Sequence, residues 1–272
     1  MCPLQHLVKQ GIRELSTLQL TYDETIFYTL IKGNEKNCCL VFLHEGLGCT
    51  KMWNDFPQRL CRKTQCPGLV YDRIGYGQSS PLKKDRTVHY LHDYALRELP
   101  NVIEAVIPER AFILIGHSDG GSISLLFGAE NPPDLKGIVT EAAHVFVDTV
   151  TLDGIRLADK AFKRGKFKGL AKYHGDKTEQ LFKAWSDTWQ RESFGFWNIE
   201  YALPSVQCPL LVIQGVDDQY GTEEQVNSIV SKSSGGAEAF FVKDCGHAPH
   251  LDQAEAVLDR ISGFVGEINS RR

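Results

Sequence analysis

Residues 116–121 read Gly116-His117-Ser118-Asp119-Gly120-Gly121 and join the apolar run 111–115 to a helical pattern over 122–129. Gly-x-Ser-x-Gly in this context predicts a sharp strand-to-helix turn. The turn strains the serine backbone, and Gly116 and Gly120 are needed because side chains there would clash where strand and helix cross. We therefore predict that Ser118 projects into a cleft at a helix N-terminus, where the helix dipole favours developing negative charge.

Short apolar runs like the one before Ser118 recur along the chain and are mostly separated by helical patterns. They are Cys38–Leu43, Gly68–Tyr71, Ala111–Ile115, Leu135–Thr140, Pro209–Ile213 and Ala239–Val242. Fully apolar strands alternating with helices are typical of a buried parallel sheet covered by helices. The segment Leu18–Lys32 instead alternates polar and apolar residues, which predicts two antiparallel strands at the sheet edge.

Three helices are indicated by spacing and by capping residues. Trp53, Phe56 and Leu60 share one face after Thr50, a candidate N-cap. A second apolar face, built from residues 257, 261, 264 and 268, lies near the C-terminus. Thr222-Glu-Glu-Gln225 has the capping-box spacing and predicts a helix start there.

The strand-helix alternation stops between residues 145 and 204, which we interpret as a helical lid inserted into a core domain of residues 1–144 and 205–272. Phe182, Trp185 and Trp189 share one helical face, and Trp197 follows. These aromatics either form the lid's own core or contact substrate. Trp185 and Trp189 are the candidates for substrate contact.

Composition limits the class of protein. The chain has 272 residues, of which 42% are hydrophobic and 24% charged, enough for one large α/β domain with an insertion. A net charge of -4 argues against nucleic acid or an anionic membrane as partner, which favours a small molecule, and the sequence is compatible with a homodimer.

The start lacks the features of a secretory signal, so we expect a cytoplasmic protein. The eight cysteines form no Cys-x-x-Cys pair, so we expect neither a disulfide framework nor a zinc site.

Two further motifs complete a resemblance to the α/β-hydrolase family over essentially the whole chain. His44-Glu45-Gly46-Leu47-Gly48 follows the run 38–43, and Asp72-Arg73-Ile74-Gly75-Tyr76-Gly77-Gln78-Ser79 follows the run 68–71. Together with the serine turn they resemble the family's oxyanion loop, its Asp-x-x-Gly-x-Gly-x-Ser turn and its nucleophile elbow. The resemblance implies a mostly parallel eight-stranded sheet flanked by helices, with the lid inserted after the sixth strand.

The resemblance also implies a Ser-His-Asp triad, because a serine hydroxyl needs a base that is itself oriented by an acid. Asp218 and His247 each follow an apolar strand, in the family's order of serine, acid and histidine. Asp217 replaces Asp218 if the turn is shifted by one residue. His250 is the rival base, but its expected role is packing or a local hydrogen bond.

The backbone N–H groups of Asp119 and Gly46 match the family's oxyanion hole, and His44 and His117 match positions that brace it and the elbow. Glu45 departs from the family, which usually has glycine there. We expect its carboxylate to be held outward by neighbours, for example by pairing with Arg73. Glu45 is also a candidate substrate contact, since Glu45 and Asp119 together would suit an amine-bearing substrate.

The resemblance therefore implies a serine hydrolase that cleaves a small or medium ester or thioester through an acyl-enzyme, with no metal or organic cofactor. The same triad supports alternatives, namely a carbon-carbon bond hydrolase, a lactonase and an aminopeptidase. A rival of another class is a ligand-binding receptor that retains the fold. A dehalogenase or epoxide hydrolase is disfavoured, because those relatives carry aspartate in place of Ser118.

Overall fold

The six apolar runs and the alternating segment before them form one eight-stranded sheet in the computed structural model, which describes residues 13–21 and 23–271. The strands are β1 (Arg13–Thr21), β2 (Glu24–Ile31), β3 (Cys39–Leu43), β4 (Gly68–Tyr71), β5 (Phe112–His117), β6 (Leu135–Glu141), β7 (Leu210–Gly215) and β8 (Ala237–Val242). Their order across the sheet is β1-β2-β4-β3-β5-β6-β7-β8. β2 pairs antiparallel with both of its neighbours, β1 and β4, and all other neighbouring strands pair in parallel. This pairing confirms the predicted fold.

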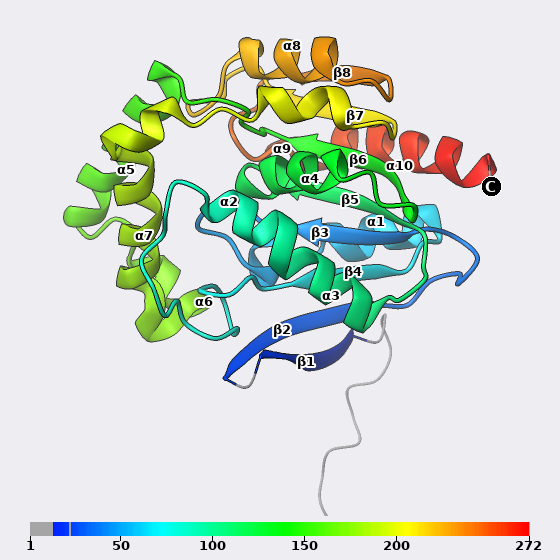
Figure 1. The fold of residues 1–272 in the computed structure, drawn as a ribbon, viewed down its shortest axis with the longest axis horizontal. Coiled ribbons are helices and arrows are strands. Elements are labelled where there is room, and N and C mark those ends of the chain that lie inside the picture. The colour runs from blue at the N-terminus through cyan, green and yellow to red at the C-terminus, as the bar shows by residue number, and fades with distance from the viewer. Residues whose placement is uncertain (1–12, 22, 272) are drawn as a thin grey trace, which may run out of the picture.

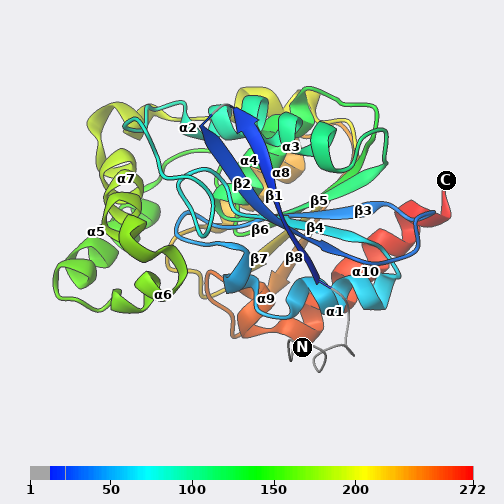
Figure 2. The ribbon, with the colours of Figure 1, turned by 90° about the horizontal axis from the view of Figure 1, so that it is seen from below.

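Helices cover both faces of this sheet, as Figure 2 shows edge-on. α2 (Tyr90–Asp93), α3 (Leu99–Val106), α4 (Asp119–Ala129) and α8 (Glu223–Lys232) lie on one face. α1 (Phe56–Thr64), α9 (Pro249–Asp252) and α10 (Ala254–Ser270) lie on the other. Each residue of β3, β4, β5 and β7 is therefore buried, which explains why these strands read as continuous apolar runs.

The chain between β6 and β7 forms a group of helices beside the sheet (Figure 1). Its elements are α5 (Thr149–Lys163), η3 (Lys168–Leu170), α6 (Ala171–His174), η4 (Gly175–Lys177), α7 (Thr178–Gln190), η5 (Glu192–Phe196) and η6 (Glu200–Ser205). His174 ties this group to the core, because its ring accepts a hydrogen bond from the Gly77 N–H and donates one to the Leu47 carbonyl. The group thereby reaches the loop after β3.

One predicted helix cap is wrong, and the other begins its helix without the expected side-chain bond. Thr50 begins a short 3-10 turn, η1 (Thr50–Trp53), and α1 starts only after Asn54, whose φ of 53° interrupts the helical backbone. α8 does follow Thr222, but the Thr222 side chain makes no cap hydrogen bond. The Gln225 amide instead bonds the backbone of residues 145 and 146, so a tertiary contact replaces the expected capping box.

No helix within the described part of the chain is both long enough and apolar enough to cross a membrane. Cys2 lies outside the described residues. Six other cysteines are buried, as expected for thiols packed as small hydrophobes, and Cys208 is half-buried.

Candidate active site

Ser118 lies at the turn between β5 and α4, with φ 52° and ψ −115°. A non-glycine residue adopts this conformation only under constraint. The constraint is the crossing of strand and helix: a Cβ on Gly116 would lie 2.2 Å from the Gly120 carbonyl oxygen, and one on Gly120 would lie 2.0 Å from that of Leu43. Both glycines of the motif are therefore sterically required.

Three predicted residues come together at the carboxyl ends of β5 and β7 and in the loop after β8. His247 Nε2 lies 2.9 Å from Ser118 Oγ, and His247 Nδ1 lies 2.9 and 2.8 Å from the two Asp218 carboxylate oxygens. Because a carboxylate only accepts, Nδ1 carries the proton and Nε2 is left to accept the serine proton. Asp217 is exposed, and the carboxylate that bonds His247 is that of Asp218.

Several groups hold the Asp218 carboxylate in its ionised form. Burial would raise its pKa, but the charge of His247 and hydrogen bonds from His247 and the Tyr220 N–H outweigh burial and lower it. The Gln214 side-chain amide also donates to this carboxylate at 2.6 Å. Asp218 is thus fixed in position and negatively charged beside the imidazole.

The predicted oxyanion donors lie on two segments next to Ser118. The Asp119 N–H is in the first turn of α4, and Gly46 is in the loop after β3; neither N–H has a hydrogen-bond partner among the residues described. A Cβ on Gly46 would lie 2.5 Å from the Trp185 ring and 3.3 Å from the Asp119 carboxylate. A side chain at residue 46 would therefore require the Trp185 ring to shift.

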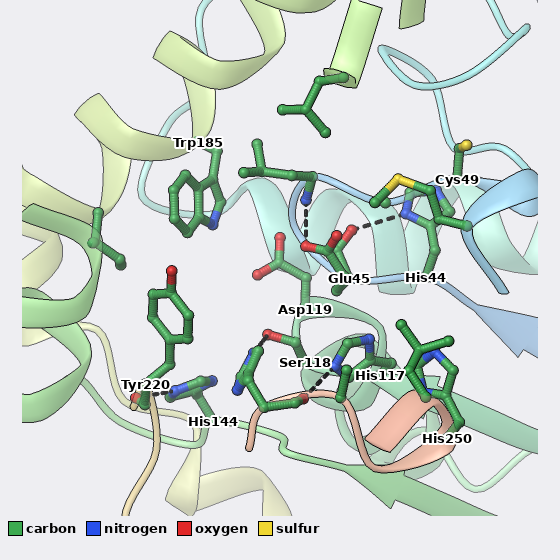
Figure 3. A pocket seen from close by; sticks show the side chains of 18 of the residues that line it. His44, Glu45, Cys49, His117, Ser118, Asp119, His144, Trp185, Tyr220 and His250 are labelled. Atoms are coloured by element: carbon green, nitrogen blue, oxygen red, sulfur yellow. Dashed lines mark hydrogen bonds between the residues drawn. The ribbon is translucent and has the colours of Figure 1, made fainter. Parts of the chain in front are cut away.

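Glu45 is not held outward, contrary to expectation. Its carboxylate lines the cavity over Ser118 and accepts the Leu47 N–H at 2.6 Å (Figure 3). Arg73 donates to the Glu45 backbone carbonyl, 2.9 Å away, and not to the carboxylate. Burial raises the pKa of the Glu45 carboxyl, which weakens its electrostatic opposition to a neighbouring oxyanion.

Asp119 also turns its side chain to this cavity. The Tyr90 hydroxyl donates to the Asp119 carboxylate at 2.9 Å, and the Trp189 indole N–H donates to that hydroxyl at 2.8 Å. Asp119 is 2% exposed, so this chain of bonds fixes a buried carboxylate next to Ser118.

The cavity has a volume of about 260 Å³ and a mostly apolar lining. Trp185 and Trp189 line it, whereas Phe182 stacks on Phe162 at 3.8 Å and Trp197 stacks on Phe194 at 5.5 Å. The aromatics singled out in this segment therefore divide between cavity lining and internal packing. Four further residues of the same inserted segment also line the cavity, namely Thr151, Ile155, Phe167 and Leu170.

Two cavity residues whose rings lie next to His247 were not anticipated from the sequence. Tyr220 and His144 both line the cavity (Figure 3). The Tyr220 ring centroid lies 4.9 Å from that of His247, and the His144 ring centroid lies 5.9 Å from it. The His144 Nε2–H donates to the Tyr220 carbonyl, and burial lowers the pKa of His144. Only the position of Tyr220 two residues after Asp218 could have suggested its role.

His44 and His117 make the bracing contacts expected of them. His44 accepts the Arg73 N–H and donates to the Glu45 carbonyl at 2.8 Å, which fixes the loop before Gly46. His117 donates to the His247 carbonyl at 2.7 Å. Burial holds the pKa of both rings well below the ordinary value, so both are neutral at pH 7.

Comparison with known proteins defines the class that this fold and site represent. Residues 40–260 match the model of the alpha/beta hydrolase family, and the chain belongs to that family. No group of three potential ligands that could hold a metal ion is found among the described His, Cys, Asp and Glu residues.

Individual relatives are distant and differ in activity. The chain is similar to serine hydrolase BPHL of Homo sapiens, 28% identical over 157 residues, a match that spans 55% of this chain and only about half (53%) of BPHL. It is 25% identical to putative esterase/lipase 2 of Mycoplasma genitalium over 91% of this chain and 97% of the relative. Among solved structures, 2-hydroxy-6-oxo-6-phenylhexa-2,4-dienoate hydrolase from Rhodococcus sp. strain RHA1 superposes with a TM-score of 0.79 at 12% identity, covering 97% of this chain and 100% of that structure. At that identity the likeness shows the fold alone.

Proposed function

We propose that this protein is a serine hydrolase that cleaves a small or medium carboxylic ester or thioester through an acyl-enzyme. The observation that carries the proposal is the unbroken line of hydrogen bonds from Asp218 through His247 to Ser118. His247 takes the Ser118 proton as the oxygen attacks the carbonyl carbon, and the Asp119 and Gly46 N–H groups hold the oxyanion. His247 then protonates the leaving group and later activates the water that releases the acid.

The substrate class follows from the size and lining of the cavity. A space of about 260 Å³ walled by Trp185, Trp189, Ile155 and Leu170 suits a compact apolar acyl group more than a long chain. In this proposal residues 145–204 act as a lid, because these four wall residues belong to that segment. The related esterase/lipase supports an ester bond as the target.

A second candidate is hydrolysis of an aminoacyl ester or amide, favoured by the two carboxylates on the cavity wall. Glu45 and Asp119 lie beside the nucleophile, and a buried carboxylate is stabilised by an ammonium group brought by the substrate. A substrate panel separates the candidates: matched p-nitrophenyl esters of butyrate and of an α-amino acid, with a lactone, a thioester, an aryl-diketo acid and an aminoacyl amide.

Replacement of the nucleophile tests the mechanism. Ser118→Ala should reduce kcat for a p-nitrophenyl ester by more than about a hundredfold, since loss of a covalent nucleophile removes the acyl-enzyme route. Its melting temperature should match the wild type, because the change deletes one hydroxyl.

Wild-type protein should show a burst of p-nitrophenol and covalent labelling by a fluorophosphonate. Labelling without turnover of any substrate in the panel would favour a ligand-binding receptor, and residual turnover above about a hundredth of wild type would rule out Ser118 as nucleophile.

A further inference from the structure

A second histidine-carboxylate pair lies beside the Asp218–His247 pair. It joins Glu141, the last residue of β6, to His250 in α9. The Glu141 Oε2 atom accepts the His250 backbone N–H at 3.0 Å and the His250 Nδ1–H at 2.9 Å. Both side chains are almost fully enclosed, with 0% exposure for Glu141 and 4% for His250.

The backbone of Glu141 also contacts the nucleophile. Its carbonyl accepts the Ser118 N–H at 2.8 Å, and the β5–β6 register sets His117 opposite Glu141. His117 in turn donates to the His247 carbonyl. The segment 247–250 is therefore held at both ends. His117, which precedes Ser118, bonds His247, and Glu141, whose carbonyl bonds the Ser118 N–H, bonds His250.

Aromatic packing keeps this second pair in place. The His250 ring lies 4.4 Å from the Trp53 ring, 4.9 Å from His117 and 5.5 Å from Phe56, centroid to centroid. Rings enclosed in this way hold one rotamer. The Glu141 contact therefore gives the segment 247–250 a second anchor to the residues around Ser118, in addition to the His117 bond to the His247 carbonyl.

We propose that Glu141 and His250 are positioning residues that hold the His247 ring in line with Ser118. This inference rests on the proposed function, because it concerns the alignment of the proposed base with the proposed nucleophile. It assigns no proton transfer to either residue. The consequence is that loss of the pair lowers the reactivity of Ser118 and leaves substrate affinity intact.

Three variants test this role against a merely structural one. His250→Asn keeps an N–H donor near the position of Nδ1 and should retain activity within about threefold, since the bond to Glu141 persists. His250→Leu removes the donor, and the double variant Glu141→Gln/His250→Leu removes it without leaving an unpaired buried charge. Gln253→Ala is the matched control, because Gln253 follows the same segment, is only partly buried, and its side-chain amide donates to the Asp244 carbonyl and not to Glu141.

The readouts are the second-order rate of fluorophosphonate labelling, kcat and KM for one p-nitrophenyl ester, and the melting temperature. Both Leu-containing variants should lose about tenfold to a hundredfold in labelling rate and kcat with KM within about twofold, as expected when reacting groups are misplaced by a fraction of an ångström to one ångström. Gln253→Ala should match the wild type.

A folded double variant that is labelled at the wild-type rate would overturn the inference. So would a loss in His250→Asn as large as that in His250→Leu, because the retained donor would then have no effect. Failure of the wild type itself to be labelled at Ser118 is a separate result: it removes the proposed function, and the positioning role with it.

Discussion

At the scale of single residues, the choice between two adjacent carboxylates depends on the turn after β7. Asp217 and Asp218 differ by one position, and Asp218 alone turns inward to His247, where its side chain is 0% exposed. The Tyr220 N–H bonds Asp218 from two residues further on, which closes the turn around the inward carboxylate. Asp217 uses its backbone N–H to bond the Cys245 carbonyl.

Asp218→Asn should therefore be severe and Asp217→Asn mild. The asparagine amide at 218 favours the wrong His247 tautomer, and the expected loss in kcat is about ten-thousandfold. Asp217→Asn should leave kcat within about threefold, since exposed substitutions away from a site have small effects. Steady-state kinetics with one activated ester measures both, and the opposite ranking would assign the acid to Asp217.

At the scale of elements, α7 serves two surfaces at once. Phe182 faces an aromatic group formed with Phe162 and Phe167, while Trp185 and Trp189 reach the cavity. Phe182 is 1% exposed and Trp185 is 8% exposed, so both lose contact area when truncated. The two positions differ in what they contact, which gives a matched pair of variants one helical turn apart.

Trp185→Ala should reduce kcat/KM more for phenylacetyl than for butyryl esters, and more for butyryl than for acetyl esters, because the larger acyl groups lose more apolar contact. Phe182→Ala should affect the three esters alike and lower the free energy of unfolding by about 3 to 5 kcal/mol, the usual cost of emptying a buried aromatic site. Kinetics on the three esters and thermal melts of both variants test this. Equal losses on all three esters for Trp185→Ala would show that Trp185 serves only to pack the segment.

At the scale of the whole molecule, the site occupies the edge where the carboxyl ends of the parallel strands meet the inserted helices. Several buried ionisable side chains lie near this edge. The Arg73 guanidinium, 0% exposed, lies 4.7 Å from the Tyr76 ring centroid, and the Arg86 guanidinium lies 4.7 Å from that of Tyr90. The Glu98 carboxyl, 8% exposed, accepts a hydrogen bond from the Ile74 N–H at 3.0 Å.

Glu98 should make global stability depend on pH. Burial raises the pKa of its carboxyl to about 8 from an ordinary value of 4.5, and the Ile74 N–H and Arg73 only partly oppose this. Because the folded pKa is the higher one, the stability from Glu98 is fully present below pH 4.5 and is lost as the pH rises toward about 8.

Glu98→Gln keeps an oxygen for the Ile74 N–H and cannot ionise. Its melting temperature should exceed that of the wild type at pH 8, and the difference should shrink at pH 5. Thermal melts of both proteins at the two pH values are the measurement. The same difference at both pH values would mean that ionisation of Glu98 has no effect on stability.

The sequence alone was sufficient for the strand-helix order, the serine turn and the positions of Asp218 and His247. These follow from local rules: fully buried parallel strands must be apolar, and the crossing at Ser118 admits only glycine at 116 and 120. Functional side chains of such a sheet follow strand ends, so motif order along the chain located the candidate site.

Only the tertiary structure decided which side chains meet across long separations. From the sequence we predicted that Glu45 faces outward and that Gln225 completes a capping box. Neither prediction is correct, because burial and hydrogen-bond partners from other elements outweigh local preference. Helical spacing places Phe182 and Trp185 on the same face, yet of these two residues only Trp185 borders the cavity. The contact between Glu141 and His250, 109 residues apart, had no local signal at all. Such contacts depend on strand register and on how helices pack, and a pattern within one segment carries no information about either.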